Sequence, residues 1–367
     1  MTQQMEDDMA TTTTPFDAAR AEAFGGEIFG LYKGAMVTYM IDIGHRTGLF
    51  TAAAEGPATS KGLAVRAGLE ERYVREWLGA MTTAHIFEYD PTSGVYELPP
   101  EHAACLTGDG SSNAARLSQF ATHLGRFVQP VAGVFRDGGG IPYSEYVPEF
   151  TDVMDASSRN VFDEHLLDDL VPLIPGLPGR LTTGARVADV GCGTGHAIVV
   201  MARAYPASTF IGYDTSGPAI ARARAEAADA ALTNATFELR DVAGLTVDEP
   251  FDAIMSFDTI HDQADPDAVL SAVHGALVPG GSYLMVEPRV SSSLEDNIDN
   301  PMAPLLYSIS TLHCLTVSLA QGGAGLGTAF GEQKALELLA TAGFGAIEVH
   351  PAPGDPLDGV YVAHKEG

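Results

Sequence analysis

The sequence predicts an α/β protein in which a doubly wound, mostly parallel sheet follows a mainly helical N-terminal domain. From Ala185 onward, short apolar strands alternate with alanine-rich helices, a pattern typical of a doubly wound sheet. Before Ala185, apolar residues recur at helical spacing instead. The chain has 367 residues, 46% of them hydrophobic, which is enough apolar material for two domain cores.

The chain is expected to begin with a disordered tail over residues 1–15. This segment is acidic and rich in threonine, and it lacks the basic start and apolar stretch of a signal peptide. Over residues 16–50 apolar residues recur at helical spacing, and glycines interrupt them at Gly25, Gly26 and Gly34. We therefore expect two or three helices there, broken at these glycines.

The rest of the first domain, which we assign to residues 16–110, has the outline of a winged helix. Ser60 can cap a short helix, Gly68 turns the chain, and a second amphipathic helix follows over residues 70–80. A short hairpin with turn chemistry at its centre spans residues 86–98.

Charge argues against nucleic acid and membranes as partners. Residues 41–107 hold five Lys or Arg against nine Asp or Glu, whereas phosphate contacts need a basic face. The net charge of −28 would also repel an anionic membrane surface, and no apolar run of about 18 residues predicts a spanning helix.

The three cysteines have neither metal nor redox spacing, which indicates a cytoplasmic protein without disulfides.

A helical bridge that covers the active site is expected between the domains, over residues 111–182. Its clearest amphipathic helix spans residues 160–174 and is stopped by Pro175 and Pro178. An aromatic series in this bridge is interpreted either as the lining of an apolar pocket or as ordinary core packing. The series comprises Phe120, His123, Phe127, Phe135, Tyr143 and Tyr146.

Seven strands are expected in the second domain, residues 183–367. The last two are joined without a helix, so they should pair antiparallel as a hairpin. A long insertion over residues 288–331 precedes the last helix and is interpreted as a lid, with glycine hinges over residues 322–327. The expected strands are 186–190, 209–213, 236–240, 251–257, 281–286, 346–350 and 360–364.

A glycine loop after the first strand predicts a site for an adenosine-containing cofactor. The loop reads Asp-Val-Gly-Cys-Gly-Thr-Gly over residues 189–195, and its glycines allow a tight turn and close approach to a ligand. Asp214 ends the second strand, where a carboxylate can accept both hydrogen bonds of a ribose diol. Asp241 ends the third strand and can accept from an adenine amino group. The candidate cofactor-binding residues are Asp189, Gly191, Cys192, Gly193, Gly195, Asp214, Thr215, Asp241, Val242, Phe257 and Asp258.

Together these positions resemble the class I S-adenosylmethionine-dependent methyltransferases. The shared pattern adds a His-Asp pair after the fourth strand and Pro-Gly-Gly before the fifth, and it covers residues 183–367. The resemblance implies a Rossmann-like seven-stranded methyltransferase sheet with an antiparallel C-terminal hairpin. It also implies S-adenosylmethionine as the cofactor.

The first domain resembles the winged-helix dimerisation domain of bacterial and plant small-molecule methyltransferases. This resemblance implies a homodimer that acts on a small-molecule substrate, and the apolar helices of residues 16–50 favour a dimer on physical grounds too. Segments at residues 260–266, 294–297 and 312–319 resemble a bacterial winged-helix methyltransferase family whose substrates are mostly unassigned. The substrate and the accepting atom, O, N or C, therefore stay open.

His261 is the candidate catalytic base. Methyl transfer is an in-line displacement on a sulfonium, so the protein must align the nucleophile, exclude water and remove a proton. In the O-methyltransferases that this chain resembles, a histidine at this place, followed by an acid as Asp262 follows here, takes a hydroxyl proton. An imidazole with its ordinary pKa of about 6.5 can do so near neutral pH. A buried structural histidine is the alternative.

A second histidine, His313, lies in the insertion and suggests metal chemistry. Its placement resembles the iron-dependent α-keto acid C-methyltransferases, in which two such histidines hold a metal that the keto acid chelates. The resemblance implies His261 and His313 as ligands of a divalent metal such as iron. A metal-bound keto acid would form a stabilised enolate whose β-carbon attacks the methyl group. Glu295, Asp262, water or the substrate would complete the coordination shell.

Two other function classes stay open. One is a transcription regulator whose methyltransferase-like domain only senses S-adenosylmethionine; the acidic balance argues against it. The other is a nicotinamide dehydrogenase, which could also use the glycine loop and Asp214. The GxGxG spacing, Asp241 and the terminal hairpin argue against a dehydrogenase.

Overall fold

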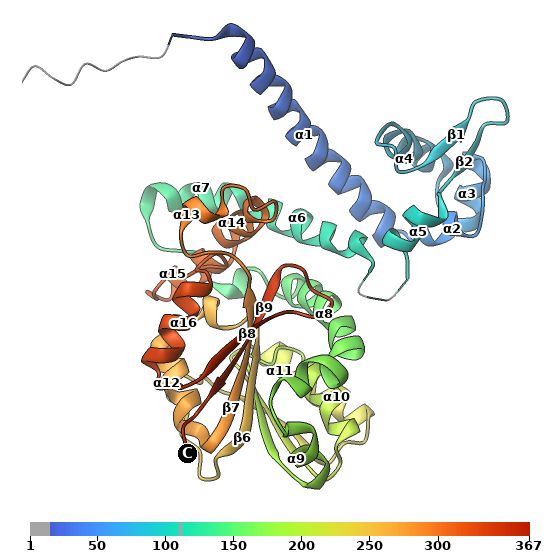
Figure 1. The fold of residues 1–367 in the computed structure, drawn as a ribbon. Helices are drawn as coiled ribbons and strands as arrows, with labels where there is room; N and C mark the ends of the chain where they lie inside the picture. Colours follow the sequence, from blue (N-terminus) through green and yellow to red (C-terminus); the bar gives the residue numbers. More distant parts are fainter. Residues whose placement is uncertain (1–14, 109, 111) are drawn as a thin grey trace, which may run out of the picture. The chain divides into compact units, whose positions relative to one another are not determined.

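The computed structural model describes residues 15–108, 110 and 112–367, which form two compact units (Figure 1). The first unit reaches to Pro99, and the second runs from Pro100 to Gly367. The second unit therefore holds the expected helical bridge together with the expected cofactor-binding domain. Apart from Pro15, the expected N-terminal tail lies outside the described residues.

The first unit begins with one long helix, α1 (Ala18–Arg46). The expected breaks at Gly25, Gly26 and Gly34 are wrong, since all three glycines lie inside this helix. A glycine inside a helix costs only about 1 kcal/mol relative to alanine, so the surrounding helix formers prevail. The chain turns instead at Gly48, whose φ of 71° is in the region that favours glycine.

The expected winged helix follows α1. Helix α3 is capped by Thr59, whose side-chain oxygen accepts from the N–H of Gly62, whereas the Ser60 hydroxyl donates to Glu71 at 2.6 Å. The predicted Ser60 cap is therefore wrong by one residue, because Thr59 already has the extended backbone of an N-cap. The elements are α2 (Leu49–Ala54), α3 (Ser60–Ala67), α4 (Glu71–Thr83), β1 (Glu88–Asp90) and β2 (Val95–Glu97).

One seven-stranded sheet, in the order β5-β4-β3-β6-β7-β9-β8, forms the centre of the second unit. The first five strands are parallel, and β9 runs antiparallel to both β7 and β8, which confirms the expected C-terminal hairpin. The strands are β3 (Arg186–Val190), β4 (Thr209–Asp214), β5 (Ala235–Leu239), β6 (Phe251–Phe257), β7 (Leu277–Pro288), β8 (Ile347–Pro351) and β9 (Asp358–His364).

Helices cover both faces of this sheet. Successive strand residues point to opposite faces, so Val187 belongs to one buried apolar cluster and Ala188 to another. Helices α10 and α11 pack in the first cluster, and α12 and α16 in the second, which gives the doubly wound architecture that was predicted. These helices are α10 (His196–Ala204), α11 (Gly217–Asp229), α12 (Pro266–Ala276) and α16 (Glu332–Thr341).

Residues between Pro100 and the sheet are mainly helical, as expected. The predicted amphipathic helix is a π-helical continuation of α8, and Pro178 lies in the first turn of α9 rather than ending a helix. The elements are α5 (Pro100–Leu106), η1 (Ala114–Leu117), α6 (Ser118–Leu124), η2 (Gly125–Phe127), α7 (Val128–Asp137), η3 (Tyr143–Glu145), α8 (Glu149–Val161), η4 (Phe162–Leu170), η5 (Val171–Leu173) and α9 (Leu177–Thr183).

The insertion after β7 contains three helices, α13 (Leu294–Asn297), α14 (Ala303–Leu312) and α15 (Cys314–Ala320). Residues 303–320 are long and apolar enough to cross a membrane, although 44% of this stretch is buried. The backbone breaks within it at His313, which separates α14 from α15. Val317 of α15 packs with apolar residues of α6, α7 and α8. Part of this apolar stretch is therefore packed inside the second unit.

Candidate active site

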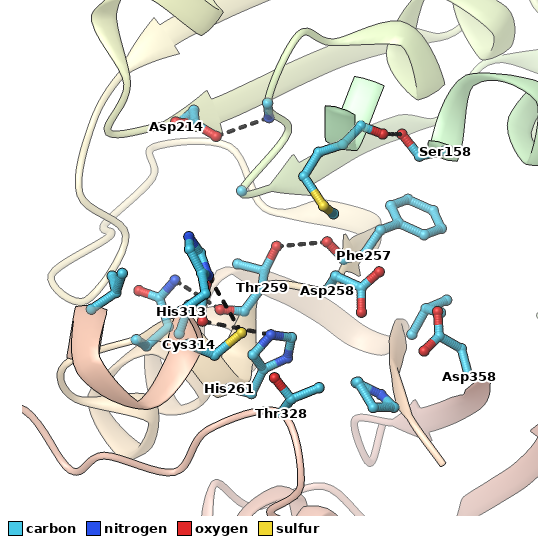
Figure 2. A pocket seen from close by; sticks show the side chains of 18 of the residues that line it. Ser158, Asp214, Phe257, Asp258, Thr259, His261, His313, Cys314, Thr328 and Asp358 are labelled. Carbon is cyan, nitrogen blue, oxygen red and sulfur yellow. Dashed lines mark hydrogen bonds and ion pairs between the residues drawn. The ribbon is translucent and has the colours of Figure 1, made fainter. Parts of the chain in front are cut away.

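A cavity of about 490 Å³ lies at the carboxyl ends of the parallel strands, where open α/β sheets bind their ligands (Figure 2). A smaller cavity of about 110 Å³ adjoins it beneath the glycine loop. Of the candidate cofactor-binding residues, Gly195 alone lines neither cavity. A Cβ atom there would collide with Phe237 and Ala223, so this glycine allows close packing. The predicted residues that do line them are Asp189, Gly191, Cys192, Gly193, Asp214, Thr215, Asp241, Val242, Phe257, Asp258, His261, Asp262 and His313.

Backbone hydrogen bonds hold the glycine loop against β4. The N–H groups of Gly191 and Cys192 donate to the carbonyl of Tyr213 at 2.8 and 3.0 Å. Gly191 has a φ of 75°, and a Cβ atom there would collide with Thr259. The loop thus needs glycine both for its backbone angle and for its close approach to the turn after β6.

Two carboxylates flank this loop. Asp214 accepts from the N–H groups of Gly193 at 2.8 Å and Ser216 at 2.7 Å. Asp189 is buried, and its Oδ1 has no hydrogen-bond partner among the described residues. Burial, together with the nearby Asp214, raises the pKa of Asp189 to about 8. An unpaired buried acceptor beside a glycine cradle indicates a ligand that brings its own donors.

These residues fit S-adenosylmethionine. Asp214 would accept from the ribose hydroxyls, Asp189 would accept from the ammonium group, and Asp241 and Val242, which line the same cavity, would lie at the adenine. Thr215 follows Asp214 along the same wall. When bound, S-adenosylmethionine supplies an electrophilic methyl group on a sulfonium.

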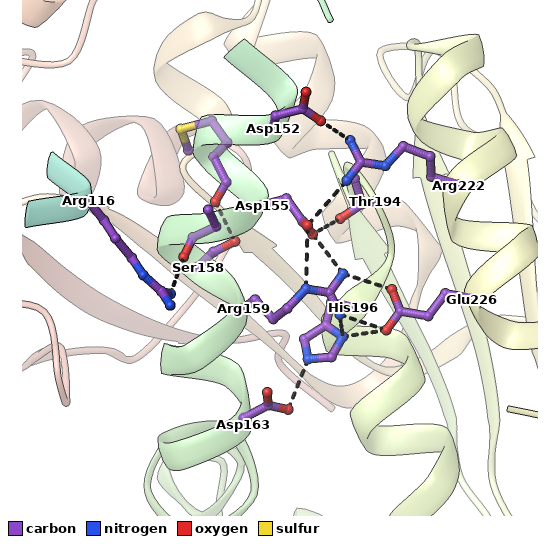
Figure 3. Close-up of polar contacts among 12 residues, drawn as sticks. Arg116, Asp152, Asp155, Ser158, Arg159, Asp163, Thr194, His196, Arg222 and Glu226 are labelled. Atoms are coloured by element: carbon purple, nitrogen blue, oxygen red, sulfur yellow. Dashed lines mark hydrogen bonds and ion pairs between the residues drawn. The ribbon is translucent and has the colours of Figure 1, made fainter. Parts of the chain in front are cut away.

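A polar network joins α8 to the glycine loop (Figure 3). Thr194 of the loop donates to Asp155 of α8, and Arg159 of α8 bridges Asp155 at 2.9 Å and Glu226 at 2.8 Å. His196, at the start of α10, reaches Glu226 at 2.6 Å. Burial opposes the ionisation of Glu226, but hydrogen bonds from Arg159 and His196 lower its pKa to about 2. This network fixes α8, one wall of the cavity, against the loop.

His261 lies in the short helix η6 (Ile260–Asp262) directly after β6. Its Nδ1 is 2.5 Å from Oε2 of Glu287, a fully buried residue near the end of β7. The other oxygen, Oε1, accepts from the N–H groups of Thr259 at 3.2 Å and Ile260 at 2.7 Å. Because Glu287 occupies Nδ1, the imidazole keeps Nε2 for other partners.

Electrostatics around His261 favour the imidazolium. Burial lowers the pKa of His261, but Glu287, Cys314 and Asp262 outweigh burial and raise this pKa well above its ordinary value. Sequence reasoning missed Glu287. The available signal was an acid within the otherwise apolar segment that ends β7.

His313 lines the same cavity but has a different environment. Its ring is fully buried, stacks on Phe150 at 3.8 Å between centroids, and meets Tyr146 edge-on at 4.5 Å. Burial lowers the pKa of His313 to about 4, so the ring is neutral. Its Nδ1 lies 4.0 Å from Asp262, and its Nε2 has no hydrogen-bond partner among the described residues.

The donor atoms closest to a metal-binding arrangement belong to His261, Asp262 and Cys314. One ligand atom from each lies within 4.8 Å of the others, and His313 is outside this group of described residues. Sequence reasoning missed Cys314, which directly follows His313. Glu295, named as a further ligand, is exposed on α13 and does not line the cavity.

The glycine-rich segment of the insertion packs beside His261. Ala324 donates its N–H to the carbonyl of Ala264 at 2.8 Å, and a Cβ atom on Gly323 would collide with the Ala264 backbone. The Ser318 hydroxyl donates to the carbonyl of Gln263 at 2.9 Å. The segment therefore closes over the residues after His261, while its movement as a lid stays a prediction.

The predicted aromatic series divides between pocket and core. Phe120 and Tyr143 line the large cavity. Phe127 and Tyr146 are buried and stack on each other at 3.9 Å, while Phe135 is exposed. Both interpretations of the series are thus correct for some of its members.

Comparisons with known proteins agree with this architecture. Residues 35–108 match the family model for an Rv2258c-like winged HTH domain, and residues 181–343 match that for a methyltransferase domain. Over 142 residues the chain is 28% identical to a trans-aconitate 2-methyltransferase of Methylobacterium nodulans, which covers 39% of this chain and 48% of that protein. The corresponding enzyme of Streptomyces coelicolor is 31% identical over 143 residues, 39% of this chain and 44% of that protein. The chain thus spans less than half the length of these relatives.

Solved structures share the fold over nearly the whole chain. A putative O-methyltransferase of Nostoc punctiforme superposes with a TM-score of 0.72 at 17% identity, covering 96% of this chain and 100% of that one. Human N-acetylserotonin methyltransferase in complex with S-adenosylmethionine superposes with a TM-score of 0.65 at 17% identity, covering 97% and 99%. The chain therefore carries a winged helix-turn-helix domain followed by a methyltransferase domain, and it shares the fold of a methyltransferase solved in complex with S-adenosylmethionine.

Proposed function

We propose that this protein transfers a methyl group from S-adenosylmethionine to a hydroxyl group of a small molecule, with His261 as the general base. The observation that carries the proposal is the buried His261–Glu287 pair, which lies in the same cavity as the glycine loop and Asp214. A positioned imidazole at that place can remove the proton that an attacking hydroxyl must lose.

Each residue has a defined task in this reaction. Glu287 holds the proton on Nδ1, so Nε2 of neutral His261 accepts the proton of the substrate hydroxyl. The Glu287 carboxylate then stabilises the imidazolium that forms. Phe120, Tyr143 and Phe150 supply apolar walls that exclude water from the reacting groups.

A second candidate is metal-assisted C-methylation of an α-keto acid through His261 and His313. Two observations favour it: Oδ1 of Asp262 and Nε2 of His313 are both buried and have no hydrogen-bond partner among the described residues. A divalent ion such as iron would satisfy such atoms, and the Cys314 thiol lies within reach of His261 and Asp262. Bound to the keto acid, the ion would supply enolate stabilisation.

One experiment separates these functions. The purified protein is incubated with methyl-labelled S-adenosylmethionine and a panel of phenols, amines and α-keto acids, with and without Fe²⁺. The base mechanism predicts metal-independent labelling of a phenol that is lost in His261→Ala and kept in His313→Ala. Labelling that requires Fe²⁺ and both histidines would favour the metal mechanism instead. Metal content that is unchanged in the double variant would exclude the two histidines as ligands.

The assembly proposed for this enzyme is a homodimer formed through α1. Apart from Asp42 and Gly44, this 29-residue helix has no buried residue in the chain alone. A second copy would cover its apolar side chains, which include Phe29, Leu31 and Met36.

We also propose that the enzyme works in the cytoplasm without nucleic acid or membrane partners. Its three cysteines are free thiols, as a reducing compartment favours. The acidic winged helix supports a role in dimerisation rather than in DNA binding.

A further inference from the structure

We propose that the methyl acceptor carries a positive charge, such as a protonated amine, and that Asp258, Asp355 and Asp358 bind this charge at one end of the cavity. The inference rests on the proposed function and specifies its substrate class.

Three separate elements bring these carboxylates to the cavity. Asp258 directly follows β6, Asp355 lies in the loop between β8 and β9, and Asp358 is the first residue of β9. Asp358 pairs in the sheet with Pro288 of β7, which places it beside the end of the strand that carries Glu287. Figure 2 shows the carboxylates of Asp258 and Asp358 turned toward each other. All three residues line the large cavity, and Asp258, which is also a candidate cofactor-binding residue, lines the small cavity at the glycine loop as well.

The backbone at Asp258 supports a binding role. This residue has a φ of 49°, a conformation that non-glycine residues rarely adopt. Its N–H donates to the carbonyl of Val286 at 3.0 Å, which holds the turn in place. Such conformations concentrate at functional sites, where the surrounding structure maintains them.

The carboxylate of Asp358 has no partner among the described residues. Asp358 is only 8% exposed, and its side chain forms neither a hydrogen bond nor an ion pair within the part of the chain that the structure describes. Asp355 accepts from the N–H of Leu357 at 2.8 Å. A buried carboxylate that faces a cavity without a donor is costly unless a ligand supplies one.

Among the described residues, no Lys, Arg or His forms an ion pair with any of the three carboxylates. His261 is the positive residue that acts on both Asp258 and Asp358, and Glu287 already pairs with it. His165 packs against Gly354 of the same loop, but its Nδ1 is paired with Asp169 at 2.7 Å. Among the described residues that line the large cavity, Arg240 is the sole Lys or Arg, and it lies next to Asp241 at the adenine end.

The carboxylates also repel one another. Burial raises the pKa of Asp258 to about 7, and burial together with Asp258, Asp355 and Glu287 raises the pKa of Asp358 well above its ordinary value. Without a cation the group therefore takes up protons near neutral pH, and a bound ammonium would replace them. The three side chains do not form a set of metal-ligand atoms as close as His261, Asp262 and Cys314 do. An extended organic cation fits them better than a single metal ion.

The same charges disfavour an anionic acceptor. Trans-aconitate, named for the relatives, is a tricarboxylic acid, and in this cavity it would meet Asp258, Asp262, Asp355 and Asp358. Like charges in a partly buried site repel strongly. An acceptor with one ammonium group would be attracted by these carboxylates instead of being repelled.

Three phenols of similar size test the inference by calorimetry on the protein saturated with S-adenosylhomocysteine. Tyramine carries an ammonium group, 4-ethylphenol is neutral, and 3-(4-hydroxyphenyl)propionate carries a carboxylate. We expect tyramine to bind at least about tenfold more tightly than 4-ethylphenol, and the propionate to bind most weakly. Asp358→Asn should remove most of the tyramine preference and leave the affinity for 4-ethylphenol unchanged. The control Asp267→Asn removes the same charge from the exposed surface of α12 and should keep the preference.

Each remaining outcome has a definite meaning. Equal affinities, tighter binding of the propionate, or no binding of any phenol would overturn the inference. So would a loss of cofactor affinity in Asp358→Asn with an unchanged phenol ranking, because the carboxylates would then serve the cofactor. The proposed function fails separately, if wild-type protein binds neither S-adenosylmethionine nor S-adenosylhomocysteine.

Discussion

Glu287 holds the imidazole of His261 and the backbone turn that carries it with the same carboxylate. One oxygen lies 2.5 Å from Nδ1 of His261, and the other accepts from the N–H groups of Thr259 and Ile260. The orientation of the imidazole is therefore built into the connection between β6 and η6. This arrangement fixes one proton on Nδ1 of His261 and leaves Nε2, which lies 3.6 Å from Oδ1 of Asp262, as the nitrogen that can accept a proton.

The pH dependence of methyl transfer should reflect the pKa of His261 as Glu287 sets it. Because the pKa of His261 is raised well above 6.5, the imidazole becomes a base only as pH rises through that higher value, and kcat/KM should rise with it. In Glu287→Gln the largest of the charges that raise this pKa is gone and burial remains, so the rise in kcat/KM should move to lower pH. The maximal rate should fall roughly 10- to 1000-fold, because the imidazolium loses its counter-charge.

A pH profile of kcat/KM, with NMR titration of the His261 ring as a probe that needs no acceptor, measures this shift. Ring titration at the same pH in wild type and Glu287→Gln would contradict the assigned role of Glu287.

Arg159 should contribute to stability through its two carboxylate partners. Arg159→Ala leaves Asp155 and Glu226 without their bridging cation, and we expect a loss of about 1–3 kcal/mol at pH 7, since the arginine is about one-third exposed. The pKa of Glu226 is depressed, so its contribution is complete above its unfolded pKa of about 4.5 and is lost as pH falls toward 2.

Urea unfolding of the wild type and Arg159→Ala between pH 7 and pH 3 checks this prediction. The difference between their free energies of unfolding should become smaller as the pH falls toward 3. The exposed Arg203→Ala serves as control. If the difference in free energy of unfolding did not change with pH, Glu226 would not be the source of the stability effect.

The homodimer proposed to form through α1 should dissociate when apolar side chains of this helix are replaced by polar ones. Phe29 and Met36 lie two turns apart on this helix and are exposed in the single chain. The double variant Phe29→Ser and Met36→Ser should shift the protein from dimer to monomer in light scattering at micromolar concentration. Lys33→Ser, on the same helix, should stay dimeric. A wild-type protein that is monomeric at this concentration would refute the dimer itself.

The sheet could be predicted because its strands are short apolar runs bounded by glycine, proline and acidic residues. Strand β6 begins and ends at the residues that were predicted. The glycine loop and Asp214 line the same cavity, as predicted for residues that follow neighbouring parallel strands. The breaks predicted at Gly25, Gly26 and Gly34 were wrong, since glycine spacing alone does not show whether the surrounding sequence can sustain a helix.

Residues whose role depends on a distant partner could not be predicted. Glu287 is one acid near the end of an apolar strand, and only the pairing of β6 with β7 brings it to His261. Asp358 meets Asp258 because β9 runs antiparallel beside β7, a relation with no local signal. Cys314 joins His261 and Asp262 because the chain breaks at His313 and redirects α15.

Cofactor binding tests the central claim most directly. Calorimetric titration of S-adenosylhomocysteine into wild-type protein should give one site per chain, and Asp214→Asn should weaken it about 10- to 100-fold by removing a charged acceptor. Asp229→Asn, an exposed change on α11, should bind like wild type. Absence of binding to the wild-type protein would contradict the account, and undiminished binding to Asp214→Asn would contradict the placement of the cofactor at the glycine loop.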